Sequence, residues 1–320
     1  MIKRIAVATT GGDAPGMNPA IRAVVRTALS KKLEVFGIFR GWWGLINEEL
    51  KALDHRSVSG IINQGGTILK TARCQEFFTP EGQERAYQTL KKNAIDGMIV
   101  IGGNGSFTGA HQLYQKYKFP CIGVPASIDN DLNGIDVTIG SDTAINTALS
   151  AIDNIRDTAT SLERIFVVEV MGRDCGFIAL AVALAGGCED VIIPEKKYDL
   201  TRVCEDIVQG NLRGKASWII VVAEGAGSAV DIAKRIKEIT GLETRAVVLG
   251  HVQRGGRPTA FSRDLALKLG QAAVEHLLNG KTDKAVVLHC GRVNTLDFEN
   301  AIKKKELDVD TWYNLLKSLS

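Results

Sequence analysis

Short apolar runs alternate along this chain with longer segments of helical period. Most of the runs are apolar at every position, which is typical of parallel strands that helices cover on both faces. The predicted strands are Ile5–Thr9, Val35–Phe39, Gly97–Ile101, Cys121–Val124, Ile165–Val170, Val191–Ile193, Trp218–Ala223, Ala246–Leu249 and Ala285–His289. The predicted helices are Asn18–Ser30, Gly82–Asn93, Phe107–Tyr117, Asp142–Thr158, Cys175–Leu184, Leu200–Leu212, Ala229–Thr240, Ser262–Leu278 and Glu299–Lys304. This alternation predicts an α/β fold built from parallel sheets.

The length of the chain indicates two such domains. With 320 residues it can form two substantial cores, so we expect two doubly wound, mostly parallel sheets in Rossmann-like three-layer domains. No linker marks the boundary, and we place it near residue 140, before a long predicted helix. The net charge of +3 is too small to indicate binding to nucleic acid or an anionic membrane, so local arginine clusters would have to bind any anionic ligand.

Cysteine usage and the start of the sequence favour a cytoplasmic setting. None of the six cysteines forms a C-x-x-C pair, and a chain of this length does not need disulfides for stability. The first residues enter a predicted strand at once, without the apolar stretch of about 7–15 residues that marks a signal peptide. No apolar run reaches the roughly 18–20 residues of a membrane span.

Two glycine-rich turns each follow a predicted strand and open a predicted helix. They are residues 10–18, Thr-Gly-Gly-Asp-Ala-Pro-Gly-Met-Asn, and residues 101–106, Ile-Gly-Gly-Asn-Gly-Ser. Doubly wound folds bind ligands at the carboxyl ends of their strands, where glycines let backbone N–H groups approach phosphate oxygens. A tight turn without a ligand is the alternative for either motif alone. Together the two turns indicate one extended phosphate-bearing ligand, and a nucleoside triphosphate has the required length.

An acidic turn, Pro-Ala-Ser-Ile-Asp-Asn-Asp at residues 125–131, follows the predicted strand Cys121–Val124. Two carboxylates separated by one residue could divide the work of a general base and a metal ligand. A solvated Asn/Asp turn is the ordinary alternative. The position after a strand, near the glycine-rich turns, favours the functional interpretation.

Five motifs together resemble the bacterial ATP-dependent 6-phosphofructokinases, the phosphofructokinase A family. They are Gly-Gly-Asp-Ala-Pro-Gly-Met-Asn at 11–18, Gly-Gly-Asn-Gly-Ser at 102–106, Ile-Asp-Asn-Asp at 128–131, Met-Gly-Arg at 171–173 and Gly-His-Val-Gln-Arg-Gly-Gly at 250–256. The resemblance extends from Met1 to about Gly280. It implies the phosphofructokinase fold, an ATP-binding domain (residues 1–140 and 255–305) and a fructose 6-phosphate-binding domain (residues 141–254 and 306–320). It also implies the glycolytic transfer of the ATP γ-phosphoryl to the 1-hydroxyl of D-fructose 6-phosphate, giving fructose 1,6-bisphosphate and ADP, with Mg²⁺ as cofactor.

The resemblance assigns roles to individual residues. The resemblance implies three catalytic residues, Asp129, Arg173 and Ser127. Asp129 corresponds to the base that accepts the sugar hydroxyl's proton, and Arg173 would stabilise the transferring phosphoryl. Ser127 keeps a hydroxyl where the family usually has Thr. Asp131 and Asn104 would hold the metal. The residues expected at the ATP site are Gly12, Arg73, Cys74, Gly103, Asn104, Gly105 and Ser106. Those expected at the sugar-phosphate site are Ser127, Ile128, Asp129, Arg164, Met171, Gly172, Arg173, Glu224, Arg245, His251, Val252, Gln253 and Arg254.

The family also implies partners and regulation. Its members place the equivalents of Arg164 and Arg245 in the neighbouring subunit's site, which implies a homotetramer. A second phosphate-binding cluster would bind ADP or phosphoenolpyruvate as effectors. Its expected residues are Arg22, Arg26, His55, Arg156, Gly187, Glu189, Arg213 and Lys215. His55 stands where some relatives have Arg, which bears on effector affinity.

Three positions depart from the family pattern and keep alternatives open. Asn104 replaces a metal-binding aspartate, and Phe177 and Ser262 replace two further acids. Weaker Mg²⁺ binding and a slower reaction are expected, because an amide offers an oxygen but no charge. An attenuated paralogue that acts as a regulatory subunit or sensor is therefore one alternative. A pyrophosphate-dependent enzyme is disfavoured by the small residues Gly105 and Ala126, and a Rossmann dehydrogenase by the missing G-x-G-x-x-G spacing.

Overall fold

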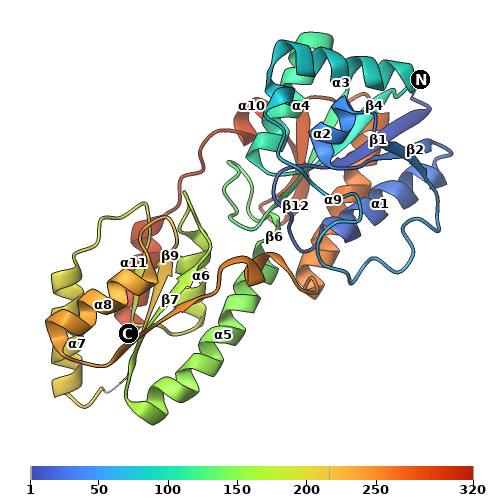
Figure 1. Cartoon of the computed structure of the whole chain (residues 1–320). Helices are drawn as coiled ribbons and strands as arrows, with labels where there is room; N and C mark the ends of the chain where they lie inside the picture. Colours follow the sequence, from blue (N-terminus) through green and yellow to red (C-terminus); the bar gives the residue numbers. More distant parts are fainter. Residues whose placement is uncertain (1, 216, 320) are drawn as a thin grey trace. The chain divides into compact units, whose positions relative to one another are not determined.

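The protein, seen here as a computed structural model that describes residues 2–215 and 217–319, folds into two compact units (Figure 1). Unit 1 comprises residues 2–143 and 254–305, and unit 2 comprises residues 144–253 and 306–319. The sequence prediction divided the chain at 140/141, 254/255 and 305/306. The assignment of ATP to one part and sugar phosphate to the other stays a prediction.

Unit 1 is built on a mostly parallel sheet with the strand order β12-β11-β5-β4-β1-β2-β3, in which β6 also pairs with β5. Only the edge strands β3 and β12 run antiparallel to their neighbours among the described residues. The strands are β1 (Arg4–Thr9), β2 (Glu34–Ile38), β3 (Leu50–Leu53), β4 (Gly97–Gly102), β5 (Cys121–Ser127), β6 (Ile139–Gly140), β11 (Lys284–His289) and β12 (Arg292–Asp297).

The register of the central strands positions the candidate site. Thr9 of β1 pairs with Ile101 of β4, and Gly102 of β4 pairs with Pro125 of β5. Because these strands are parallel, the turns that follow β1, β4 and β5 emerge at the same edge of the sheet. Both glycine-rich turns and the acidic turn therefore share one edge.

Helices cover both faces of this sheet (Figure 1). Helices α1 and α9 pack against each other on one face, whereas α2, α3, α4 and α10 supply a hydrophobic core on the other. In that core the Phe107 and Phe298 ring centroids lie 5.0 Å apart, and Trp42 stacks on Phe77 at 4.1 Å. The helices of unit 1 are α1 (Met17–Ser30), α2 (Gly41–Ile46), η1 (Glu76–Phe78), α3 (Pro80–Lys92), α4 (Asn104–Tyr117), α9 (Ala260–Leu278) and α10 (Phe298–Ala301).

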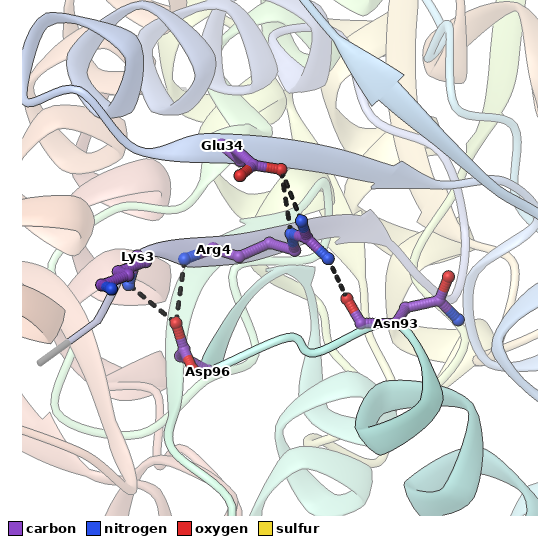
Figure 2. A network of polar contacts seen from close by, with 5 residues as sticks. All are labelled: Lys3, Arg4, Glu34, Asn93 and Asp96. Atoms are coloured by element: carbon purple, nitrogen blue, oxygen red, sulfur yellow. Dashed lines mark hydrogen bonds and ion pairs between the residues drawn. The ribbon is translucent and has the colours of Figure 1, made fainter.

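A polar network fixes the amino end of β1 (Figure 2). The Arg4 guanidinium donates to Glu34 Oε2 of β2 at 2.7 and 3.0 Å and to the Asn93 carbonyl at 2.7 Å. Asp96 Oδ2 accepts the backbone N–H groups of Lys3 and Arg4 at 2.7 and 2.9 Å. These bonds join β1 to β2 and to the segment before β4, so they support the register that aligns the turns at the opposite edge.

Unit 2 is built on a parallel sheet with the order β10-β7-β9-β8. Its strands are β7 (Ile165–Val170), β8 (Asp190–Ile192), β9 (Trp218–Ala223) and β10 (Thr244–Val248). Its helical elements are α5 (Ser141–Leu162), α6 (Phe177–Ala185), α7 (Leu200–Leu212), α8 (Ala229–Thr240), η2 (Gly250–Arg254) and α11 (Val309–Leu319). Helix α5 begins in unit 1. Helices α7 and α8 pack with the sheet in one core that includes Ile207, Ile220 and Ile236, each 0 % exposed. The predicted α/β class with two mostly parallel sheets is confirmed.

Some elements escaped sequence prediction for physical reasons. Edge strand β12 is mostly exposed and carries polar residues, and β3 is four residues long, so neither forms an apolar run. Helix α2 holds two glycines in six residues. No helix in the described part of the chain is both long and apolar enough to cross a bilayer.

The core of unit 1 generates a stability prediction. Phe107 is 0 % exposed, and Phe107→Ala would leave a cavity between α4 and α10. We expect the free energy of unfolding to fall by about 3–5 kcal/mol, measured by urea denaturation followed by circular dichroism. Phe261→Ala is the matched control, because Phe261 in the same unit is 47% exposed, and equal losses in both variants would contradict the packing described.

Candidate functional site

The two glycine-rich turns of unit 1 are bonded to each other. The Thr10 N–H donates to the Ile101 carbonyl at 3.0 Å, and Ser106 Oγ donates to the Thr10 carbonyl at 3.0 Å. A Cβ at Gly102 would lie 2.2 Å from Ser106 Oγ and 2.6 Å from the Thr10 carbonyl oxygen, so only glycine allows this approach. The two turns form one backbone surface.

Helix α4 begins directly at the second turn. Its N-cap, Gly103, provides no side chain to accept the first N–H groups of the helix. A helix N-terminus without a side-chain cap attracts anions through its N–H groups and its dipole. This end of α4 is therefore suited to phosphate.

Asn104 sits at the first position of α4 with its amide engaged. Its Nδ2 donates to the Ile302 carbonyl at 2.8 Å, just after α10. Its Oδ1 lies 3.4 Å from Thr108 Oγ1, which makes the shorter bond, 3.0 Å, to the Asn104 carbonyl. The amide nitrogen thus tethers the turn to the segment that follows α10, and Oδ1 is the atom through which this side chain could bind a metal.

The acidic turn is ordered around the Ser127 hydroxyl. Ser127 Oγ donates to Asp131 Oδ1 at 3.0 Å and accepts the Asp129 N–H at 3.3 Å. The Cβ of Ser127 lies 3.6 Å from the position a Cβ would take on Gly103, so this turn lies against the second glycine-rich turn. The Asp129 backbone is thereby fixed beside the amino end of α4.

Sequence reasoning missed the contribution of Asn130 to this turn. Asn130 is 0 % exposed and has a φ of +49°. Its Nδ2 donates to the Asp136 carbonyl and its Oδ1 accepts the Thr138 N–H, both at 3.0 Å. Because asparagine tolerates the left-handed region and bonds backbone locally, Asn130 holds the conformation that separates the two aspartates. The Asp-Asn-Asp pattern was the available signal.

Thr10 is a second residue that sequence reasoning left out of the site. It is 0 % exposed, and within residues 2–215 and 217–319 its hydroxyl finds no hydrogen-bond partner. A buried hydroxyl without a partner costs free energy unless a ligand or water satisfies it. This position at the first glycine-rich turn indicates a polar ligand.

Arg254 and Arg73 bring positive charge to unit 1. Arg254 Nη1 donates to the Asp13 carbonyl at 3.2 Å and lies 2.8 Å from where a Cβ on Gly12 would be. Arg73 is exposed. Its segment is bonded to β1 at Lys70, because the Thr9 hydroxyl donates to the Lys70 carbonyl at 3.0 Å. Burial raises the pKa of the neighbouring Cys74 thiol, which keeps it protonated.

In unit 2 several predicted sugar-site residues gather at the carboxyl ends of β7 and β9. The buried Gln253 accepts the Met171 N–H at 2.8 Å. The Gly225 N–H donates to the Gly172 carbonyl at 3.2 Å, beside Glu224. The exposed side chains of Arg173, His251 and Val252 adjoin this cluster in the sequence.

Two predicted arginines lie elsewhere in unit 2. Arg164 precedes β7 and Arg245 is the second residue of β10, so both sit at the amino ends of strands. Arg164 lies 3.0 Å and Arg245 2.5 Å from the Glu243 carboxylate. The hydrogen bonds from Arg245, which has the larger effect, and from Arg164 lower the pKa of that carboxyl. At about 3.3 Å per residue, β7 separates Arg164 from Met171 by roughly 20 Å. Within one unit, therefore, the structure does not bring these arginines to Met171 and Gln253.

The predicted effector residues form local groups in each unit. In unit 1 Arg26, one turn after Arg22 on α1, donates to the His55 carbonyl at 3.3 Å. In unit 2 Arg156 donates to the Gly187 carbonyl at 2.8 Å. Lys215 lies 3.2 Å from Glu189, and Arg213 is the C-cap of α7.

The two other departures from the family pattern have structural contacts. The Phe177 ring lies 5.9 Å from that of Trp312 in α11, and the buried Ser262 hydroxyl lies 2.9 Å from that of Thr143. Both residues therefore contribute to packing within their own units.

Comparison with known proteins agrees with this geometry. A profile of the phosphofructokinase family matches residues 4–277. The chain is 52% identical over 319 residues to a curated protein of Clostridium botulinum named ATP-dependent 6-phosphofructokinase, with 100% of both chains covered. A Clostridium acetobutylicum protein of the same name is 53% identical over 301 residues, 94% of each chain. The solved structure of Saccharomyces cerevisiae phosphofructokinase matches with a TM-score of 0.86 and 35% identity, covering 94% of this chain and 45% of the yeast chain. The resemblance inferred from the five motifs is confirmed, and the chain belongs to the phosphofructokinase family.

Proposed function

We propose that this protein is an ATP-dependent 6-phosphofructokinase that transfers the γ-phosphoryl of ATP to the 1-hydroxyl of fructose 6-phosphate. Family membership and the full-length relatives that carry this name support the proposal. The observation that carries it is the placement of the acidic turn against the glycine-rich turn at the start of α4. A carboxylate would thereby lie near a helix end suited to phosphate, which is what phosphoryl transfer to an alcohol requires.

Unit 1 would bind ATP. The peptide N–H groups at Gly12, Gly103 and Gly105 would face the phosphates, and the buried Thr10 hydroxyl lies at the first of the two turns. Arg73 would neutralise phosphate charge, with Cys74 and Ser106 beside it. Arg254 contacts the Gly12–Asp13 turn. Its charge would therefore lie near the ATP phosphates, in addition to its proposed role in binding the sugar phosphate.

Asp129 would act as the general base. Its carboxylate would accept the proton of the 1-hydroxyl as that oxygen attacks the γ-phosphorus and the bond to the β-phosphate oxygen breaks. The bond from the Asp129 N–H to Ser127 fixes the backbone that carries this carboxylate. Ile128 is buried beside it.

The residues present fit Mg²⁺ that is bound largely through the nucleotide. The described residues contain no group of three or more His, Cys, Asp or Glu side chains placed to hold a metal. Mg²⁺ commonly uses one or two carboxylates plus substrate phosphates. Asp131 would be the carboxylate, with Asn104 contributing only through Oδ1. When bound, Mg²⁺ neutralises charge on the phosphates.

Unit 2 would bind fructose 6-phosphate through Met171, Gly172, Arg173, Glu224 and the 251–253 segment. Arg164 and Arg245 lie at the other end of the sheet. This supports the proposal that they bind fructose 6-phosphate in the site of a neighbouring subunit, and hence that the protein is a homotetramer. We further propose a cytoplasmic, glycolytic enzyme with ADP or phosphoenolpyruvate as effector at the predicted cluster.

The base assignment predicts the effect of Asp129→Asn. Loss of proton acceptance should lower kcat by about 10²–10⁴-fold, while the KM values for both substrates change little because the amide keeps the shape of the side chain. A coupled aldolase assay measures both constants. Asp136→Asn is the control, since Asp136 is an exposed acid of the same segment, and unchanged kcat in Asp129→Asn would refute the assignment.

The state of Asn104 predicts opposite effects of Asn104→Asp on stability and metal use. The Ile302 carbonyl would lose its donor, which should cost about 1–3 kcal/mol and lower the melting temperature. The added carboxylate should reduce the Mg²⁺ concentration needed for half-maximal activity. Asn104→Ala should show the stability loss without the metal gain. If the wild-type protein binds both substrates without turnover and Asn104→Asp restores turnover, the sensor alternative holds instead.

Gly105 provides a test of where the nucleotide lies. A Cβ at Gly105 would meet no protein atom within 4 Å, so Gly105→Ala should keep or slightly raise the melting temperature. The KM for ATP should rise at least tenfold, with the KM for fructose 6-phosphate unchanged, because the methyl group would occupy the phosphate path. An unaltered KM for ATP would place the nucleotide away from this turn.

A further inference from the structure

A cavity of about 500 Å³ in unit 2 lies outside all the sites described above. Its floor includes Asp190 of β8 and Val203 of α7, which are buried, and its wall includes Tyr313 and Lys317 of α11. Lys197 and Arg202, both exposed, stand at its rim. The volume is typical of pockets that hold small metabolites.

The cavity lies across β8 from part of the predicted effector cluster. Glu189 Oε2 accepts the Ile219 N–H at 2.6 Å and its Oε1 lies 3.2 Å from Lys215. The next residue, Asp190, instead pairs with Lys317 at 2.8 Å. Because successive residues of an extended chain project to opposite sides, the two adjacent acids face different surroundings, and only Asp190 faces the cavity.

Each of the acids that line the cavity contacts a named partner, and Lys317 serves two of them. Lys317 lies 2.8 Å from Asp190 and 4.0 Å from Asp206. The Asp199 carboxylate caps α7 by accepting the Thr201 N–H at 2.9 Å. The three acids that line the cavity are thus engaged.

The lysine before Lys197 is also engaged. Lys196 pairs with Asp310 at 3.0 Å and lies over the Tyr313 ring. For Lys197 and Arg202, by contrast, the described residues supply no ion-pair partner within 4.0 Å. Two cations that make no ion pair within 4.0 Å in the described part of the chain, at the mouth of a cavity with a buried floor, favour an anionic ligand.

We propose that this cavity binds a small organic polyanion, a phosphorylated or polycarboxylate metabolite, between Lys197 and Arg202. The anionic groups lie at the rim against these two side chains, and the body of the ligand enters toward Val203 and Tyr313. Lys317 compensates the charge of the buried Asp190 at 2.8 Å, so this acid of the floor repels the ligand less.

The segment at the rim also links the cavity to the sugar side of unit 2. Lys197 and Tyr198 line a second hollow together with Gly225 and Ala226, the residues that follow Glu224. Glu195 of the same segment accepts the Gly176 N–H at 2.8 Å, just after Met171–Arg173 in the chain. A polyanion at the rim therefore acts on the segment that supports the proposed sugar-phosphate site. This coupling rests on the proposed function, whereas the binding does not.

Calorimetric titration of the full-length protein at constant ionic strength tests the binding. The probes are inorganic phosphate and propane-1,2,3-tricarboxylate, which separate the phosphate and carboxylate sources. For at least one probe, the variant Lys197→Ala/Arg202→Ala should lack one class of binding sites that the wild type has, or that class should bind the probe at least tenfold more weakly. The control Lys234→Ala/Arg235→Ala removes the same charges from the exposed face of α8 and should bind like the wild type. Equal binding by all three proteins, or equal losses in both variants, would overturn the proposal.

Steady-state kinetics tests the coupling separately. The probe that binds should shift the fructose 6-phosphate concentration for half-saturation at least twofold in the wild type and the control, but not in Lys197→Ala/Arg202→Ala. A shift that persists in that variant would overturn the coupling. If the wild type does not phosphorylate fructose 6-phosphate at all, the proposed function fails, while the titration still decides whether the cavity binds anions.

Discussion

The bond from Ser106 Oγ to the Thr10 carbonyl, together with the parallel register of β1, β4 and β5, is the constraint on which the candidate site depends. Parallel pairing brings three strand ends to one edge, but it does not decide how closely the turns approach. The absence of a side chain at Gly102 allows the serine hydroxyl to close that distance. A single hydrogen bond of this kind contributes about 1 kcal/mol to stability, yet here it holds the two glycine-rich turns against each other.

The acidic turn is held on this scaffold by similar local hydrogen bonds. Its shape is fixed by Ser127 and by the buried Asn130, so the two aspartates owe their positions to the side chains beside them. Asn104 shows how one position can exchange roles. Where an aspartate would supply charge for a metal, the asparagine donates to the Ile302 carbonyl and holds α4 in place. We therefore expect this one substitution to weaken metal binding and to add a local hydrogen bond.

How much the sequence predicts depends on whether a feature is local. The buried strands and their helices follow from continuous apolar runs, and the turn motifs mark the site because glycine and aspartate have few other reasons to follow strands. The exposed strand β12 lacks that pattern. The tether from Asn104 to Ile302 spans 198 residues, and the contact of Arg254 with the Gly12 turn joins opposite ends of the chain. Such long-range pairings depend on packing, which no local pattern reports.

The most direct measurement is a crystal structure of the protein with fructose 6-phosphate and a non-hydrolysable ATP analogue. The γ-phosphate should lie against the turns at Gly12 and Gly103, with the sugar 1-hydroxyl at about 2.6–3.2 Å from the Asp129 carboxylate. A sugar hydroxyl beyond reach of Asp129, or a nucleotide bound away from the amino end of α4, would contradict this mechanism.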